Sequence, residues 1–158
     1  MIQRIQSVFL ALLALAMGSV LFLPLWHKID GRMLQELTLT AFGFVGKGMP
    51  EQPAGVGPVW AIGALAGTSA AVALAELFQF RNRTRQQVLG QLNLLLITAT
   101  LGAEFYFANQ GEQLLNIKLE GQFQAGFYLP TLALLLNLLA SRFIRRDEQL
   151  VRSMDRLR

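Results

Sequence analysis

The middle of the chain, residues 59–107, reads VWAIGALAGTSAAVALAELFQFRNRTRQQVLGQLNLLLITATLGAEFYF. Two apolar runs, 59–80 and 88–107, are separated by a short segment that contains three arginines. About 20 mostly apolar residues are enough to cross the hydrocarbon core of a bilayer as a helix. The connection is too short to form more than a tight turn. This stretch therefore predicts two antiparallel membrane-spanning helices.

Two further apolar runs, 5–26 and 127–144, lie outward from this pair. The first run ends in Pro24 and Trp26, and an aromatic residue there suits the membrane interface. Ala14 and Ala16 resemble the cleavage site of a secretory signal, but the apolar run continues well beyond them, which favours an uncleaved anchor. The sequence thus predicts an all-α membrane protein with four transmembrane helices in an antiparallel bundle.

The composition agrees with a membrane protein and argues against several other classes. Of the 158 residues, 53% are apolar and 15% are charged, which is too apolar for an ordinary soluble domain of this size. The net charge of +4 comes from basic residues that flank the apolar runs, so we do not expect nucleic-acid binding. With no cysteine and one histidine, His27, the chain is not expected to hold a metal or haem.

The distribution of basic residues predicts the orientation. Ten lysines and arginines fall on one side of the four runs and four on the other. Since basic residues resist translocation, the side with ten is expected to be cytoplasmic. Both termini lie on that side, so the predicted location is a bacterial inner membrane with the N- and C-termini in the cytoplasm.

Two segments on the opposite side alternate in polarity. LTLTAFGF, residues 37–44, and LLNIKLEGQF, residues 114–123, both have the period of two that is typical of a half-buried strand. We expect them to pair into a small extracytoplasmic sheet. Because two strands alone are marginal in water, the sheet should rest on the helix ends or on a partner.

Ionisable residues within membrane spans are functional candidates by default, and two carboxylates qualify. Glu76 lies near the cytoplasmic end of the second run, and we expect it to pair with an arginine of the 81–85 turn or with Arg142. Glu104 lies about 24 Å along the third run, which predicts a position near the external interface with access to water. A proton relay between them would need further titratable groups, and the runs contain none.

Amides and small residues within the runs predict helix packing. Asn93 and Asn137 can form hydrogen bonds between helices. A stripe of small residues at intervals of four follows the second run, which permits close approach of another helix; its members are Gly63, Gly67, Ala71 and Ala75. The partner helix is either in this chain, which we favour, or in another subunit.

The C-terminal segment 145–158 is predicted to continue the fourth helix into the cytoplasm as an amphipathic tail. Phe143, Leu150, Met154 and Leu157 share one helical face. The tail either lies against anionic headgroups, which is the commoner case, or docks on a partner. The candidate partner-binding residues are Arg4, Phe143, Asp147, Glu148, Leu150, Arg152, Met154, Asp155 and Arg156.

The opening MIQRIQ, the four apolar runs and the ending DEQLVRSMDRLR together resemble the Bacteroidota inner-membrane family called domain of unknown function 4293. The resemblance covers essentially the whole chain. It implies a four-span protein and carries over no catalytic residue, binding site or cofactor.

No arrangement of nucleophile, base and oxyanion donor can be assembled from these residues, and no glycine-rich phosphate loop is present. We therefore expect no enzyme and no cofactor. The leading hypothesis is a non-catalytic accessory or scaffolding subunit of a larger inner-membrane complex, in contact with lipids and other subunits. The alternative is a small transporter or channel subunit that uses its intramembrane carboxylates. An enzyme acting on lipid headgroups is a third possibility.

Overall fold

The computed structural model describes residues 2–30, 35–47, 57–79, 82–114 and 120–155. Side chains at the ends of these ranges, including residues 2–4, 83, 147, 148 and 150–155, are outside the description. The elements, in chain order, are α1 (Ile2–Val20), β1 (Trp26–Asp30), β2 (Gln35–Leu39), β3 (Phe44–Lys47), α2 (Ala61–Phe78), α3 (Arg83–Leu114), β4 (Gln122–Phe123) and α4 (Ala125–Asp155).

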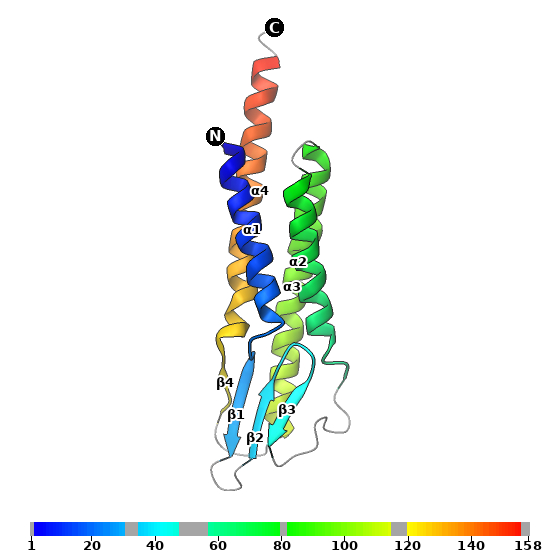
Figure 1. Cartoon of the computed structure of the whole chain (residues 1–158), viewed down its shortest axis with the longest axis vertical. Coiled ribbons are helices and arrows are strands. Elements are labelled where there is room, and N and C mark those ends of the chain that lie inside the picture. Colours follow the sequence, from blue (N-terminus) through cyan, green and yellow to red (C-terminus); the bar gives the residue numbers. More distant parts are fainter. Residues whose placement is uncertain (1, 31–34, 48–56, 80–81, 115–119, 156–158) are drawn as a thin grey trace.

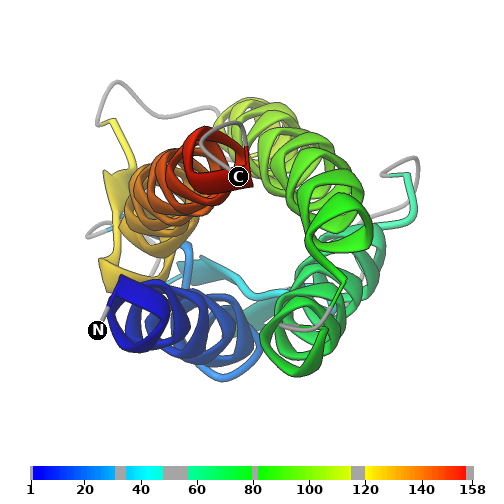
Figure 2. The same ribbon diagram turned by 90° about the horizontal axis from the view of Figure 1, so that it is seen from above.

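The helices of the described chain lie side by side in a closed ring. Helix α1 contacts α2 and α4, and α3 contacts the same two helices (Figures 1 and 2). The two termini lie at one end of the ring and the sheet at the other (Figure 1). We call the first the arginine end, because the described arginines Arg85, Arg142, Arg145 and Arg146 are there, and the second the sheet end.

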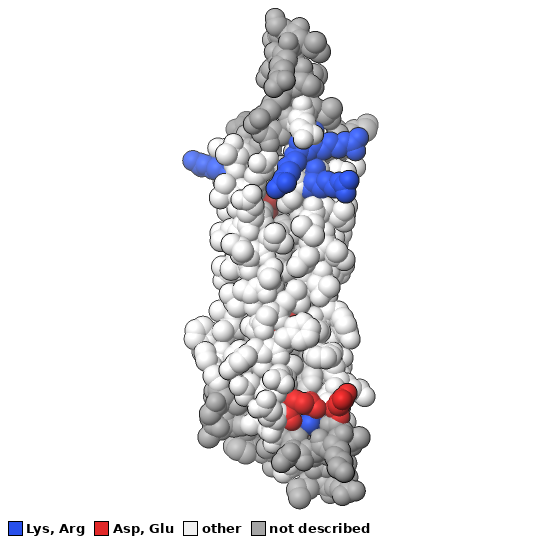
Figure 3. Space-filling view, turned by 180° about the vertical axis from the view of Figure 1, so that it is seen from behind, with Lys and Arg blue, Asp and Glu red and all other residues white. Residues whose placement is uncertain are grey.

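Three helical segments are long and apolar enough to cross a membrane: Ala61–Phe78, Thr84–Leu114 and Ala125–Arg146. The segment Ile5–Val20 of α1 is a shorter apolar helix. Large apolar side chains cover the outside of the ring, and Leu15 and Leu95 are each 69% exposed. On the face in Figure 3, a band that is almost entirely uncharged therefore separates the charged ends, as expected of helices whose outer surface faces lipid.

The first helix is shorter than predicted. Helix α1 ends at Val20, whereas the apolar run continues to Trp26. Pro24 has no backbone N–H and disfavours helical geometry in the residue before it. The chain leaves the helix through a turn, in which the amide of Leu23 donates to the carbonyl of Ser19, and Trp26 begins β1. Trp26 is buried beneath the sheet, so its predicted position at the membrane interface is wrong.

The predicted strand 37–44 is also wrong as a single element. Its first half belongs to β2 and its last residue to β3, and the chain turns between them. The Thr40 amide donates to the carbonyl of Gly43 at 2.9 Å, and the Thr40 hydroxyl donates to the same oxygen at 2.7 Å. These bonds close a tight turn that the alternating pattern does not reveal.

All strands of the described sheet are antiparallel, in the order β3-β2-β1-β4. The predicted pairing of segments 37–44 and 114–123 does not occur among the described residues. Instead β1 lies between them, with Trp26 opposite Leu39 on one side and opposite Phe123 on the other. Residues 115–119 of the second segment lie outside the described residues.

The sheet is seated on the ends of the helices. Leu37 and Leu39 of β2 are buried, and β2 contacts α3. The amide of Gly63 in α2 donates to the carbonyl of Ala41 in the β2–β3 turn at 2.9 Å. The sheet therefore closes one end of the helix ring.

Candidate functional site: carboxyl groups inside the helix ring

Polar side chains gather inside the ring, whereas in a water-soluble protein they lie mostly on the surface. The buried polar residues of the described helices are Gln6, Ser69, Glu76, Gln86, Asn93, Thr100, Glu104 and Asn137. The outer surface of the same helices is apolar. Burial of a polar group in an apolar interior costs free energy unless a partner compensates it, so this interior is the candidate functional site.

Helix α3 carries half of these residues on one face. Gln86, Asn93 and Thr100 follow one another at intervals of seven, and Glu104 comes four residues later. These intervals place side chains on the same side of an α-helix. At 1.5 Å per residue, the row extends over about 27 Å, which is most of the thickness of a bilayer core.

Glu76 lies in the arginine-end half of the ring and is fully buried. Its carboxyl group lies over Gly90 of α3: a Cβ atom at Gly90 would be 3.1 Å from Glu76 Oε1 and 3.4 Å from the hydroxyl of Ser141. The missing side chain at Gly90 therefore makes room for the carboxyl group between α3 and α4. Neither carboxyl oxygen has a hydrogen-bond partner in the described part of the chain.

The predicted ion pair of Glu76 is not found with either candidate arginine whose side chain is described. Neither Arg85 nor Arg142 forms an ion pair with this carboxyl group. Arg81 and the side chain of Arg83 lie outside the described residues. Glu76 is thus an interior carboxyl group rather than one half of a described surface pair.

Glu104 is fully buried too, and both of its carboxyl oxygens are without a hydrogen-bond partner among the described residues. The prediction that water reaches it is wrong. Helix α3 continues to Leu114 instead of ending near Phe107, and Phe107, Ala108 and Gly111 are buried beyond Glu104. The sheet covers this end of the helix, so Glu104 does not lie at a boundary.

The two asparagines link neighbouring helices. The hydroxyl of Ser69 in α2 donates to Asn93 Oδ1 at 2.6 Å, and Asn137 Nδ2 of α4 donates to the carbonyl of Gly90 at 3.0 Å. One polar atom of each amide, Asn93 Nδ2 and Asn137 Oδ1, lacks a described partner. The interior therefore has spare hydrogen-bonding capacity besides its carboxyl groups.

The small-residue stripe of α2 is not a continuous packing surface within this chain. Gly63 is buried against the β2–β3 turn, whereas Ala71 and Ala75 are exposed. A Cβ atom at Gly67 would meet no atom within 4 Å. The buried face of α2 instead includes Ala66, Ser69, Ala73 and Glu76.

Among the tail candidates, Phe143 has a described environment. It is half-buried, and its ring stacks on Phe9 of α1 with centroids 5.6 Å apart. This contact holds α4 to α1 within the chain. The side chains of the other tail candidates lie outside the described residues, although α4 itself runs to Asp155.

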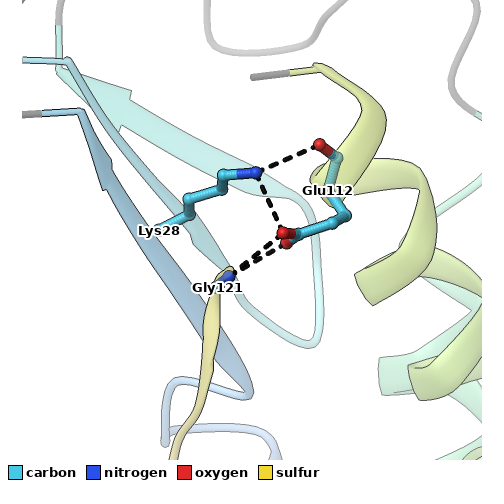
Figure 4. A network of polar contacts seen from close by, with 3 residues as sticks. All are labelled: Lys28, Glu112 and Gly121. Carbon is cyan, nitrogen blue, oxygen red and sulfur yellow. Dashed lines mark hydrogen bonds and ion pairs between the residues drawn. The ribbon is translucent and has the colours of Figure 1, made fainter. Parts of the chain in front are cut away.

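A second polar cluster, at the sheet end, was not anticipated from the sequence (Figure 4). Lys28 of β1 is buried, and its Nζ lies 3.0 Å from Glu112 Oε1 and 3.2 Å from the Glu112 carbonyl oxygen. The Glu112 carboxylate also accepts from the amide of Gly121. Lys28 and Glu112 are 84 positions apart, and no local pattern connects them. The cluster ties α3 to the sheet.

No three His, Cys, Asp or Glu side chains of the described residues gather in a way that could hold a metal ion.

Comparison with known proteins places the chain in a family. The family model described as a domain of unknown function (DUF4293) matches residues 2–157. No curated protein and no solved structure matches the chain.

Proposed function

Because the chain belongs to the DUF4293 family, whose description assigns no activity, we propose a function from the geometry of the interior. The protein crosses a bacterial inner membrane four times, with both termini in the cytoplasm. It is a small transporter or channel subunit that binds a proton or a small cation at its intramembrane carboxyl groups. The proposed orientation rests on the arginines at one end of the ring, since basic residues remain on the cytoplasmic side.

The observation that carries this proposal is the complete burial of Glu76 and Glu104 without a described hydrogen-bond partner. An ionised carboxylate in such a place is very costly, and a bound proton or cation removes most of that cost. A chain under selection for stability alone would replace these residues with apolar ones of similar size. Two such groups in one small interior therefore favour a functional role.

The interior favours a gated path over an open pore. Ile97 lies between Asn93 and Thr100 on the same face of α3 and is buried in one apolar cluster with Leu13 and Met17 of α1. Gly90, which marks the level of Glu76, and Glu104 are about 21 Å apart along α3, and Ile97 is halfway between them. Passage from one carboxyl group to the other therefore requires this apolar layer to open.

A flux measurement in liposomes tests the proposal. The full chain is reconstituted with an internal pH-sensitive dye, and a potassium diffusion potential drives protons inward. We expect flux in the wild type and at least a tenfold loss in Glu104→Gln and Glu76→Gln, because an amide cannot take up and release a proton. Glu36→Gln is the matched control, since Glu36 lies on the sheet with its side chain 40% exposed.

Folding of each variant is checked by circular dichroism and size-exclusion chromatography. Equal flux in the wild type and both interior variants would remove these carboxyl groups from the mechanism. Equal sodium or potassium flux in the wild type and both interior variants would exclude binding of a small cation at these carboxyl groups.

The accessory-subunit role is a second candidate, and one observation favours it. Helix α4 projects beyond the start of α1, the end of α2 and the start of α3 (Figure 1), so its last turns have no described helix beside them. A projecting helix with an amphipathic sequence is a common docking element. Purification in mild detergent should then recover a stoichiometric partner, and a chain truncated after Arg146 should lose it. Recovery of the full chain as a lone monomer would argue against this role.

A further inference from the structure

A cavity of about 570 Å³ lies between α3 and α4 at the arginine end. Its charged wall comes from α4, where Arg142, Arg145 and Arg146 line it. Their spacing places all three guanidinium groups on one side of the helix. Figure 3 shows basic side chains gathered at this end, at the edge of the uncharged band.

The three arginines are exposed, and none forms an ion pair with an acidic residue whose side chain is described. Three neighbouring positive charges repel one another unless an anion lies between them. Arginine is also the side chain best suited to phosphate, because its planar group can donate two parallel hydrogen bonds.

The deeper part of the cavity supplies neutral polar groups. Asn137, Ser141 and Gly90 line it. Asn137 Nδ2 already donates to the Gly90 carbonyl, and its Oδ1, unpartnered among the described residues, can accept from a hydroxyl group of a lipid headgroup but not from phosphate. The hydroxyl of Ser141 can donate a hydrogen bond to an anion. The cavity therefore offers charge at its mouth and hydrogen bonds further in.

Two leucines line the part of the cavity that is nearer to the middle of the helices. Leu94 of α3 and Leu138 of α4 both line the cavity, and Leu138 is 48% exposed on the outer surface of the ring. Charge at the level of the headgroups with leucines below it matches a molecule that has an anionic head and an apolar chain. Basic pockets between membrane helices on the cytoplasmic side bind lipid headgroups in this way.

We propose that this cavity binds the phosphate headgroup of an anionic phospholipid, with the first part of an acyl chain along Leu94 and Leu138. The shared chemistry is a phosphate anion, and the leucines favour a lipid over free phosphate as its source. Glu104 does not line this cavity, whereas the Glu76 carboxyl group lies beside Gly90 and Ser141 at its deep end. We therefore place the phosphate at the arginines, away from that carboxyl group.

Native mass spectrometry of the full chain, released from micelles, tests the lipid site. Phosphatidylglycerol, zwitterionic phosphatidylcholine and inorganic phosphate are added in separate titrations. We expect phosphatidylglycerol to bind more tightly than phosphatidylcholine, and Arg145→Gln to weaken its binding about fivefold, the effect of one arginine near an anionic headgroup. Arg145→Lys, which keeps the charge, should retain part of the binding.

Arg85→Gln is the matched control, since it removes the same charge from the same end but at a residue that does not line this cavity. Its binding should stay within twofold of the wild type, and Glu104→Gln should bind phosphatidylglycerol normally. Equal losses in Arg145→Gln and Arg85→Gln would overturn the site in favour of a general surface effect. Binding of inorganic phosphate with no preference for the lipid would overturn the lipid assignment.

Discussion

At the scale of single residues, two glycines of α2 that look alike in the sequence differ in their surroundings. Gly63 and Gly67 form the GxxxG pattern of the second apolar run. A Cβ atom at Gly63 would lie 2.9 Å from the ring of Phe42 and 3.0 Å from the carbonyl oxygen of Ala41, whereas one at Gly67 would meet nothing within 4 Å. Glycine is therefore required at position 63, where α2 contacts the β2–β3 turn, and not at position 67.

Gly63→Ala should consequently lower the free energy of unfolding by about 1–3 kcal/mol, the usual range for overpacking against a neighbour that cannot move freely. Gly67→Ala should leave it unchanged or raise it by up to about 1 kcal/mol, because alanine is the better helix former. Titration of the folded protein with a denaturing detergent measures both values. Equal losses in the two variants would mean that the pattern packs against another helix after all.

The buried Lys28 and its carboxylate partner lead to a second residue-scale prediction. Glu112→Gln should destabilise the protein by about 2 kcal/mol, since Lys28 keeps its buried charge but loses the charged acceptor. Glu36→Gln breaks the exposed Lys47–Glu36 pair at 3.6 Å and should change stability by less than about 1 kcal/mol.

The same detergent titration compares these two variants. Adding Lys28→Met to Glu112→Gln should recover part of the loss, because the unpaired charge is then gone. A loss that stays the same in the double variant would show that the charge of Lys28 is not the cause.

At the scale of elements, apolar runs predicted the apolar helices and alternation predicted a small sheet, and both are confirmed, although the predicted pairing of the two strands is wrong. The boundary between α1 and β1 could not be predicted, because an apolar run that ends in Pro24 and Trp26 looks the same whether tryptophan lies at a membrane interface or under a sheet. The extension of α3 to Leu114 was missed for a related reason. Its last turns are polar in sequence yet packed against strands, so hydropathy alone does not mark them as part of the helix.

The candidate site was predicted by residue type more than by environment. Glu76 and Glu104 stand out because carboxylates are rare in apolar runs, and composition alone is enough to find them. That both are buried depends on which face of α2 and of α3 points into the ring, and on the sheet that covers the end of α3 near Glu104. The arginine-lined cavity depends on the separation of α3 and α4, which no local pattern contains.

The strand order leads to a prediction at the element scale. His27 and Gln122 are opposite each other in the β1–β4 pair, and Cα atoms of opposed antiparallel residues are close enough for a disulfide. Since the chain has no cysteine, the double variant His27→Cys/Gln122→Cys should form one intramolecular disulfide after mild oxidation, visible as a shift on a non-reducing gel. His27→Cys/Val45→Cys, which joins residues of strands that are not paired, is the control. Equal crosslinking in the two would contradict the order β3-β2-β1-β4.

At the scale of the whole molecule, the two ends of the helix ring differ in charge and in structure. Both termini and the described arginines lie at one end of the helix ring, while the sheet lies at the other (Figures 1 and 3). The polar ends and the apolar band between them are those expected of a chain that exchanges water for lipid along most of its length.

Single cysteines placed at the two ends test this orientation. Thr84 and Val45 are both exposed, at the start of α3 and on β3. A membrane-impermeant maleimide should label Val45→Cys from the periplasmic side of spheroplasts, and Thr84→Cys only after the membrane is opened. Labelling of Thr84→Cys in closed spheroplasts would reverse the proposed topology.

The pairing of the first and last parts of the fold has a consequence for biosynthesis. Helix α1 packs on α4, and β1 is paired with β4, in which Phe123 lies opposite Trp26 although it comes 97 residues later in the chain. While the ribosome is still adding the middle of the protein, α1 does not yet have α4 beside it and β1 does not yet have β4. A nascent chain that stops before Gln122 therefore presents an open β1 edge and an α1 face that α4 has not yet covered.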